Sequence, residues 1–466
     1  MTHSADDEVI EICRDLIRID TTNPGDNSGP GERVAAEYVA GLLADAGLEP
    51  TILESAPKRA SVVTRVVGTD PSRPALMIHG HLDVVPANAA DWKVDPFSGE
   101  IAEDCLWGRG AVDMKDMDAI TLAVIRRRLR EGRRPTRDIV LTFTADEEAG
   151  GPMGARWLSR NHQELFEGVT EAISEVGGFS VTVGDQRMYV LQAAEKGLAW
   201  MRLTAEGTAG HGSMIQPDNS VTRIAEAVAR LGTHQWPLRL TTPVLMFLQA
   251  AADALGIPFD PEDPEPVLAR IGPMRRMIAA VTRNTLNPSR LQAGYKVNVV
   301  PQSATAEVDG RFIPGYEAEF FAEVDRLLGE GITREFINYD IAVETSPDGD
   351  LYDAMIDALL TEDPQASVVP YTMSGGTDAK SFSTLGIRCF GFSPLKLPPE
   401  MDFSGMFHGV DERVPLDGLR FGVRVLDRFL DNVLPGQLTE TASARALLRE
   451  IVDGRTSCGV TVTHCT

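Results

Sequence analysis

Two apolar stretches that end in polar residues decide the fold: "PALMIHGHLDVV" at residues 74–85 and "DIVLTFTADEEAGG" at residues 138–151. Each contains a nearly continuous apolar run, which is typical of a strand buried on both faces of a sheet. Residues 118–132, between them, place apolar side chains at helical intervals. Strand, helix and strand in this order predict a layered α/β structure.

The same alternation extends to both sides of these strands. Residues 33–46 repeat apolar side chains with a helical period, and residues 171–176, "EAISEV", have the character of a further strand. We therefore expect an α/β fold in which a mostly parallel sheet is covered by helices on both faces.

The pattern changes near residue 196. Residues 199–205 alternate between apolar and polar side chains, and the elements up to residue 346 follow the order β-α-β-β-α-β. This order predicts a small α+β domain inserted into the first. The predicted division is a first domain at 1–195 and 347–436, an inserted domain at 196–346 with an extra helical segment near 241–290, and a C-terminal tail at 437–466.

Composition limits the possible partners. The 466 residues carry a formal net charge of −24, which repels phosphate backbones, so we expect no nucleic-acid partner. We expect no membrane partner, because no apolar stretch approaches the about 18 residues of a membrane helix and the N-terminus lacks a signal-peptide pattern. Five cysteines without a CxxC pair favour a cytoplasmic location.

Imidazoles and carboxylates cluster where predicted strands end. In open α/β sheets, ligands bind outside the carboxyl ends of the strands, so these side chains are expected to meet at one edge. A glycine-rich loop before a helix and a motif late in the chain add one residue each. The candidates are His81, Asp83, Asp113, Glu147, Glu148, Glu175 and His408.

Buried carboxylates in such a cluster would raise one another's pKa unless they bind cations. Histidine nitrogen and carboxylate oxygen ligands suit Zn²⁺, and also Co²⁺ or Mn²⁺. One aspartate shared between two histidine–glutamate sites would create a two-metal centre. The adjacent Glu147 and Glu148 point in different directions, so one can bind metal while the other acts as a base. The spacing of His81 and Asp83 lets Asp83 accept the second imidazole N–H.

Each candidate also has a purely structural interpretation, and all of these would have to hold together to remove the metal centre. The alternatives are a core histidine (His81), a helix N-cap (Asp113), a solvated loop (Glu147 and Glu148) and solvent-facing side chains (Glu175 and His408).

A series of short motifs between residues 79 and 413 occurs in a characteristic order: "HGHLDVVP", "GRGAVDMK", "TADEEAGG", "ISEVGG", "EKG", "GHGSMIQPDNS", "NVVP", "SGGTDA" and "FHGVDERV". As a set, the motifs resemble the M20 metallopeptidase family, which includes aminoacylase-1, glutamate carboxypeptidases, arginine-pathway deacetylases and succinyl-diaminopimelate desuccinylases. The resemblance implies a zinc-hydrolase catalytic domain of mostly parallel sheet, with an inserted α+β lid that commonly dimerises.

The resemblance also implies the metal ligands. Asp113 would bridge two Zn²⁺ ions, with Co²⁺ or Mn²⁺ as alternatives. His81 and Glu175 would hold one ion, and Glu148 and His408 would hold the other.

Further roles follow from the same resemblance. Glu147 would be the general base, Asp83 the orienting acid, and His211 an oxyanion stabiliser supplied across a homodimer. The extra segment near 241–290 leaves the dimer geometry and this role of His211 open. Without the resemblance, His211 would be a turn histidine between glycines.

The substrate contacts implied by the resemblance are Asn298, Arg311, Gly376 and Thr377, which match positions that hold a substrate carboxylate. The planar guanidinium of arginine pairs well with a carboxylate. The alternative for Arg311 is an ion pair with Asp309 or Glu307.

The expected function is therefore metal-dependent hydrolysis of an amide or peptide bond in a small carboxylate-bearing substrate, an N-acyl amino acid or a dipeptide. Desuccinylase-type and acetylornithine deacetylase-type deacylation stay open. Two less favoured possibilities are a single-metal or M28-type aminopeptidase, which would not need the inserted domain, and a non-catalytic binding protein on the same scaffold.

Overall fold

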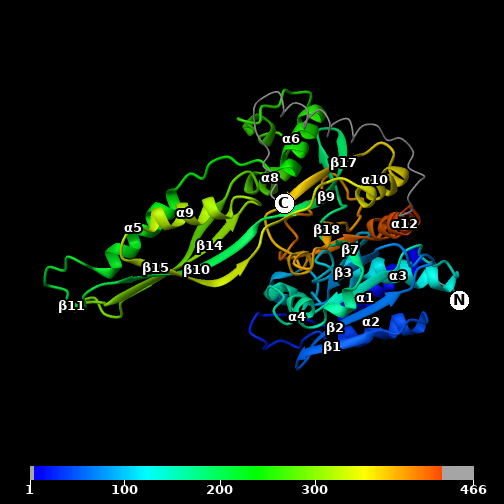
Figure 1. Ribbon diagram of the computed structural model, residues 1–466, viewed down its shortest axis with the longest axis horizontal. Helices are drawn as coiled ribbons and strands as arrows, with labels where there is room; N and C mark the ends of the chain where they lie inside the picture. The colour runs from blue at the N-terminus through cyan, green and yellow to red at the C-terminus, as the bar shows by residue number, and fades with distance from the viewer. Residues whose placement is uncertain (1–4, 433–466) are drawn as a thin grey trace.

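The computed structural model describes residues 5–432, which form a main body and a projecting arm (Figure 1). The predicted tail at 437–466, with Cys458 and Cys465, lies outside the described residues. The arm begins immediately after β9, and the chain returns from it to the main body at β16. The boundaries proposed for the domains stay predictions.

The main body is built on a ten-stranded sheet of order β1-β2-β6-β3-β7-β18-β9-β16, with β8 and β17 also paired to β9. Its centre is parallel, because β3 runs parallel to β6 and β7, and β7 runs parallel to β18. The strands are β1 (Thr51–Ala56), β2 (Arg59–Val66), β3 (Ala75–His81), β6 (Ile139–Thr144), β7 (Val169–Ser174), β8 (Ser180–Val183), β9 (Gln186–Glu195), β16 (Val343–Glu344), β17 (Ser367–Met373) and β18 (Arg388–Gly391).

Helices cover both faces of this sheet, which confirms the predicted fold class. Along β3, Leu76 and Ile78 pack into the larger core, while Ala75 and Met77 pack into a second core on the opposite face. The helices of the first face include α1 (Ala5–Arg18), α2 (Arg33–Asp45), α3 (Lys115–Arg130), α10 (Asp350–Glu362) and α12 (Leu416–Asn432); those of the second are α4 (Ala155–Asn161) and α11 (Ala379–Ser383).

Short elements complete the main body. A three-stranded sheet joins β4 (Glu100–Ala102), β5 (Cys105–Trp107) and β19 (Arg413–Pro415) in the order β19-β5-β4. It pairs the chain that precedes Asp113 with the chain that follows His408. Three 3₁₀ turns are η1 (Ala89–Asp91), η2 (Glu147–Ala149) and η3 (Gln163–Phe166).

The arm contains an antiparallel sheet of order β12-β14-β10-β15 with its own core. Two helices pack on one face, and Asn219 caps the first of them by accepting hydrogen bonds from the amides of Val221 and Thr222. The elements are β10 (Gly197–Glu206), β11 (Gly210–His211), α5 (Ser220–Thr233), β12 (Thr285–Ala293), β13 (Val299–Val300), β14 (Ser303–Phe312), α9 (Glu317–Leu328) and β15 (Ile332–Asp340).

Most of the extra segment near 241–290 packs on the main body, and only its last residues, from Thr285 in β12, join the arm, where Leu286 is part of the core. It forms α6 (Thr242–Leu255), α7 (Glu265–Leu268) and α8 (Met274–Ala280), and α6 packs along β17 of the main body (Figure 1). Val244, Phe247 and Ile278 belong to the larger core of the main body. The chain therefore leaves the arm after α5, contributes three helices to the main body, and re-enters the arm at β12.

Lys196 fastens this crossing point. It is buried between β9 and β10, and its Nζ donates to the carbonyls of Ala280 (3.0 Å) and Arg283 (2.9 Å) and to Oγ1 of Thr285 (3.0 Å). Burial lowers the pKa of Lys196 to about 7. One side chain thus joins the start of the arm to the end of the extra segment.

Within residues 5–432, no helix is both long enough and apolar enough to cross a membrane.

Replacing Phe247 by alanine tests whether the extra segment is part of the main body. Phe247 is fully buried, so we expect Phe247→Ala to lower the free energy of unfolding by about 3–5 kcal/mol. The measurement is urea unfolding followed by tryptophan fluorescence. Val221→Ala on the arm's surface is the control, with an expected change within about 0.5 kcal/mol. An equally small change for Phe247→Ala would show that α6 is not integrated into this core.

Candidate functional site

Three neighbouring strands carry candidate residues to one edge of the main sheet. His81 ends β3, Glu147 and Glu148 follow β6, and Glu175 follows β7. Because β6, β3 and β7 are parallel and adjacent, their carboxyl ends lie together. Asp113 joins them from the loop before α3, and His408 from the loop before β19.

Five of these side chains form two overlapping groups that share Asp113. In the first group, Nε2 of His81 lies 3.1 Å from Oδ1 of Asp113 and 3.5 Å from Oε2 of Glu175. In the second, Nε2 of His408 lies 3.3 Å from Oδ2 of Asp113 and 3.1 Å from Oε2 of Glu148. The two oxygens of one aspartate thus face two different histidines.

The site strongly favours positive charge. Burial alone would lower the pKa of His81, but the charge of Glu175 and the hydrogen bond to Asp113 raise it well above its usual value. Hydrogen bonds to Asp113 and Glu148 raise the pKa of His408 to about 10. Burial raises the pKa of Glu175 to about 8. The negative charge around the two imidazoles thus favours their protonated forms, and divalent cations would compete with these protons.

The donor set fits divalent metal ions. Each group offers one imidazole nitrogen and two carboxylate oxygens, all within 4.8 Å of one another. Oε1 of Glu148 is buried and has no hydrogen-bond partner in the described part of the chain. His81 Nδ1 lies 2.9 Å from the backbone oxygen of Asp83, which would fix the ring with Nε2 directed at a metal. This mixture of nitrogen and oxygen ligands suits Zn²⁺, Co²⁺ or Mn²⁺.

Glu147 lies beside the cluster without belonging to either group. Its Oε2 is 4.0 Å from Nε2 of His81, and its side chain is 14% exposed. Burial raises the pKa of Glu147 well above its usual value, and the charge of Glu175 adds to this effect. The tandem glutamates therefore make different contacts: Glu148 lies against His408, and Glu147 lies beside the cluster with its side chain partly exposed.

Asp83 makes different contacts from those expected. Its Oδ1 is 3.7 Å from His81 Nδ1, which is nearer to the backbone oxygen of the same aspartate. The carboxylate instead accepts the backbone N–H of Glu147 (3.0 Å) and of Glu148 (3.1 Å). Since residue 82 lies beyond the end of β3, the strand geometry that would have aimed the carboxylate at the imidazole no longer applies. Asp83 positions the tandem glutamates as well as the histidine.

A buried polar network lies behind Asp83. Asn23 donates to Asp83 (2.8 Å) and to Asp146 (3.0 Å), and Arg59 donates to Asn23 (2.9 Å) and forms an ion pair with Glu32. All of these side chains are buried. No local sequence pattern indicates this network, because its contacts join residues far apart in the chain.

The predicted substrate residues occupy two separate places. Arg311 lies near the base of the arm and forms an ion pair with Asp309 through Nε (2.7 Å) and Nη2 (3.2 Å), as its alternative interpretation predicted. The backbone N–H and Oγ1 of Thr377 both donate to Glu195, at 3.0 and 2.6 Å, so these polar groups are used in contacts within the protein. A side chain at Gly376 would meet Lys380, with its Cβ 2.6 Å from Nζ.

Glu195 and Lys380 hold the loop that carries Gly376 and Thr377. Lys380 Nζ donates to the backbone oxygen of Lys196 at 2.7 Å, which links this loop to the start of the arm. Glu195 and Lys196 belong to the motif "EKG", so the sequence contained a signal for them, although it assigned them no role.

His211 and Asn298 lie elsewhere, at the tip of the arm. His211 is in β11, which pairs with β13, and the amide of Gly212 donates to the carbonyl of Asn298 at 2.9 Å. β11 lies at the end of the arm farthest from the main body (Figure 1). Within one chain, the structure therefore brings neither residue to the metal-ligand cluster.

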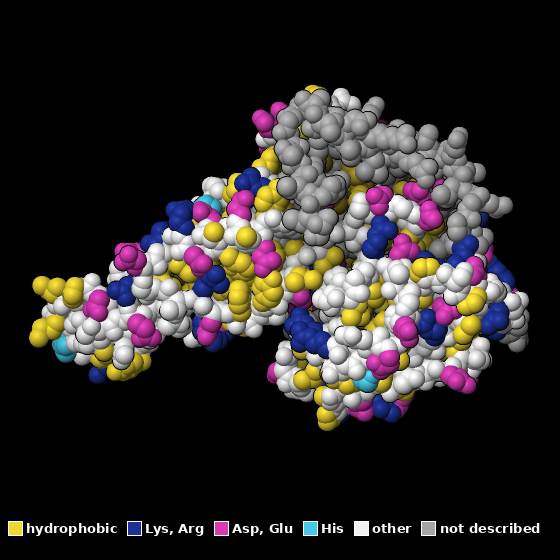
Figure 2. All heavy atoms as spheres, in the orientation of Figure 1, with side chains coloured by type: hydrophobic (Ala, Val, Ile, Leu, Met, Phe, Trp, Pro, Cys, Tyr) yellow, Lys and Arg dark blue, Asp and Glu magenta, His cyan; other side chains and the backbone are white. Residues whose placement is uncertain are grey.

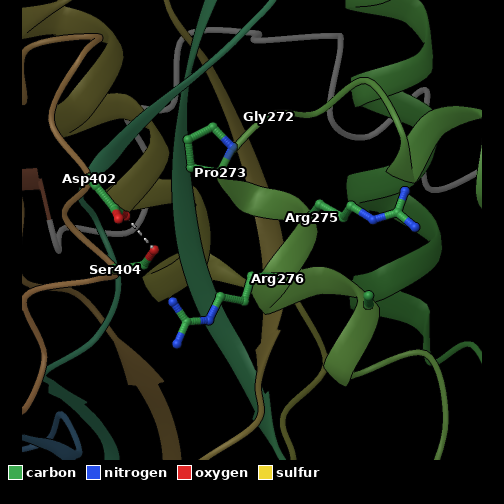
Figure 3. Close-up of a pocket in the computed structure, with 7 residues that line it drawn as sticks. Gly272, Pro273, Arg275, Arg276, Asp402 and Ser404 are labelled. Carbon is green, nitrogen blue, oxygen red and sulfur yellow. Dashed lines mark hydrogen bonds between the residues drawn. The ribbon is translucent and has the colours of Figure 1, made fainter.

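A cavity of about 430 Å³ separates α8 from the loop that leads to His408 (Figure 3). Arg276 extends toward Asp402 and Ser404 across it, and Pro273 forms part of its wall. None of the predicted site residues lines this cavity.

Residues 77–432 match the peptidase family M20/M25/M40. The chain belongs to this family. It is thus an M20 amidohydrolase or peptidase, which confirms the resemblance seen in the sequence motifs. Family membership, together with the arm and its sheet and helices, argues against an M28-type aminopeptidase.

Relatives support the same assignment. The N-fatty-acyl-amino acid synthase/hydrolase PM20D1 of Mus musculus is 26% identical, with 82% of this chain and 80% of that protein covered. Aminoacylase-1 of Sus scrofa is 26% identical, with 87% and 90% covered.

Solved structures show the same fold. The M20 metallo-carboxypeptidase Sso-CP2 of Sulfolobus solfataricus has a TM-score of 0.69 at 19% identity, covering 91% of this chain and 99% of that one. The YXEP protein of Bacillus subtilis, described as a dinuclear metal binding peptidase, has a TM-score of 0.60 at 13% identity, covering 92% and 98%.

Proposed function

We propose that this protein is a two-metal hydrolase that cleaves an amide or peptide bond in a small substrate with a free carboxylate. The observation that carries the proposal is the pair of ligand groups that share Asp113, with Glu147 beside them. The dinuclear description of the YXEP protein supports this reading.

The proposed metal ligands follow from the two groups. His81 and Glu175 would hold one ion, Glu148 and His408 the other, and Asp113 both, with Zn²⁺ favoured and Co²⁺ or Mn²⁺ as alternatives. When bound, such a pair supplies polarisation of the scissile carbonyl and a water of lowered pKa.

Glu147 performs the proton transfers in this proposal. Its carboxylate removes a proton from the attacking water and then delivers it to the nitrogen of the leaving amine. Asp83 supports this role, because its carboxylate accepts the backbone N–H of Glu147 and limits how far the residue can move. A non-catalytic scaffold protein would have no need for this arrangement.

Arg311 supports a substrate with a free carboxylate. The ion pair with Asp309 uses Nε and Nη2 and leaves Nη1 outside it. The loop of Gly376 and Thr377 is linked through Lys380 and Lys196 to the base of the arm, where β14 carries Arg311. The names of the relatives point to N-acyl amino acids and peptides, so we favour an N-acyl amino acid or a dipeptide, with N-succinyl and acetylornithine-type substrates as alternatives.

We further propose a homodimer in which His211 serves the partner's site. His211 lies at the arm's tip, where Met214, Ile215, Tyr295 and Val297 are exposed and Figure 2 shows apolar side chains gathered. Such a patch is typical of an interaction surface. In such a dimer, His211 and Asn298 of one chain would contact the oxyanion and the carboxylate of a substrate bound in the other chain. Within a single chain, the arm's tip lies too far from the metal-ligand cluster for these contacts (Figure 1).

A cytoplasmic location is part of the same proposal. Its support is that Cys13, Cys105 and Cys389 are buried free thiols.

Metal removal combined with Glu147→Ala tests the proposed chemistry. We expect chelation to abolish hydrolysis of N-acetyl amino acids or dipeptides, and Zn²⁺, Co²⁺ or Mn²⁺ to restore it. Glu147→Ala should bind as much metal as the wild type, yet turnover should fall by about 10²–10⁴-fold, since proton transfer is lost. Metal content and turnover are measured on the same samples. The exposed Glu164→Ala is the control; full activity in metal-free protein would refute the two-metal mechanism.

Arg311→Ala tests the carboxylate contact. Losing a charged hydrogen bond of about 1.5–3 kcal/mol should lower kcat/KM about 10–100-fold, mostly through KM. The same substrate with its carboxylate converted to an amide should lose much less. Arg290→Ala, which removes another arm arginine paired with an acid, is the control. Equal losses for both substrates would contradict the assignment.

Mixing two inactive variants tests whether His211 acts across the dimer. His211→Ala and Glu147→Ala should each be nearly inactive alone. After subunit exchange, random pairing of the two chains yields one intact site in each mixed dimer, so about one quarter of wild-type turnover should return. No recovery, with exchange verified by differently tagged chains, would place His211 outside the partner's site.

A further inference from the structure

A buried ion pair joins the two loops that carry Asp113 and His408. Arg109 precedes Asp113 by four positions, and Glu412 follows His408 by four. Both side chains are buried, and Nη1 of Arg109 donates to Oε2 of Glu412 at 2.8 Å. Neither residue belongs to the metal-ligand groups, to the proposed base or to the substrate contacts.

Glu412 holds the backbone that leads into Asp113. Its Oε1 accepts the N–H of Val112 at 2.7 Å, and its Oε2 accepts the N–H of Gly110 at 3.1 Å. Val112 is bonded directly to Asp113, so the amide that Glu412 fixes is one peptide unit from the shared ligand. Gly110 has a φ of +85°, and a Cβ there would lie 2.8 Å from Cγ1 of Val84, which favours glycine at this turn.

Arg109 holds the other loop. Its Nη2 donates to the backbone oxygen of Gly409 at 2.7 Å, immediately after His408. The guanidinium carbon lies 5.1 Å from the centre of the Trp92 ring, which restricts the arginine's position. The N–H of Gly108 also donates to the backbone oxygen of Glu412 at 3.0 Å. The ion pair and these neighbouring hydrogen bonds together join the two loops at several points.

The two metal-ligand groups depend on this pair to different degrees. In the group of Asp113, Glu148 and His408, two of the three ligands come from the tied loops. In the other group only Asp113 does, since His81 and Glu175 are held by the ends of β3 and β7. Loosening the ion pair would therefore disturb the group of Asp113, Glu148 and His408 more than the group that contains His81 and Glu175.

We infer that Glu412 and Arg109 are positioning residues that set His408 against Asp113 and thereby control the affinity of one of the two metal sites. The inference rests on the proposed two-metal function. Replacing a residue that orients metal ligands typically weakens metal binding about 10–100-fold. Glu412→Gln keeps the shape of the side chain but removes its charge and turns one acceptor into a donor.

The experiment is a titration of the metal-free full-length chain with Co²⁺, followed by calorimetry and by the visible absorption of bound Co²⁺. We expect the wild type to take up two equivalents. Glu412→Gln should keep one tight equivalent and bind the other about 10–100-fold more weakly. Glu362→Gln, which alters an acid paired with Arg424 and Arg428 far from the site, is the matched control and should bind like the wild type.

The possible outcomes separate the inference from the function on which it rests. A wild type that binds fewer than two equivalents would overturn the two-metal proposal itself. Two equivalents in the wild type, with unchanged or equally weakened binding at both sites of Glu412→Gln, would overturn the positioning role alone. If Glu412→Gln fails to fold, Arg109→Lys is titrated instead, because lysine keeps the charge but lacks the planar fork whose two terminal nitrogens bond Glu412 and Gly409 separately. Selective weakening of one equivalent in that variant supports the inference, and two normal equivalents refute it.

Discussion

The crowding of carboxylates around Asp113 is the constraint on which the rest of the structure depends. Asp113, Glu147, Glu148 and Glu175 meet in a space where burial raises the cost of negative charge. Two imidazoles, one on each side of Asp113, partly offset that charge by taking up protons. A site of this kind favours added positive charge, so its electrostatics and its proposed metal chemistry have the same origin.

The fold meets this constraint by distributing the ligands over rigid and tied supports. His81 ends β3 and Glu175 directly follows the adjacent parallel strand β7, so the pairing of these strands brings the two residues together. Asp113 and His408 come from loops, which are fixed by a buried acid and arginine in addition to the pairing of β5 with β19. Asp83 does the same for the tandem glutamates through their backbone amides. Each ligand that comes from outside the main sheet therefore has a buried charged group behind it.

Much of this arrangement was predictable from the sequence, but only where the signal was local. The apolar run that ends at His81 predicted both a buried strand and a side chain at its carboxyl end, and β3 has both. The motifs around Asp113, Glu148 and His408 predicted the members of the cluster. The contacts of Arg59, Asn23 and Glu412 were not predictable, because each joins residues far apart in the chain and leaves no periodic pattern. For the same reason, the sequence predicted a helical segment near 241–290, but not that α6 packs on β17.

The placement of α6–α8 also bears on how the arm takes part in function. The chain passes between arm and main body at Lys196, at 234–241, at 281–284 and at 341–342, and Lys196 bonds the first of these crossings to the third. An insertion joined only at its two ends could pivot freely, whereas this arm is also held by a segment that belongs to the main body's core. Bringing His211 from the tip to its own chain's Asp113 would require breaking those contacts. A second copy would not have to break them, which supports the proposal that His211 serves the partner's site.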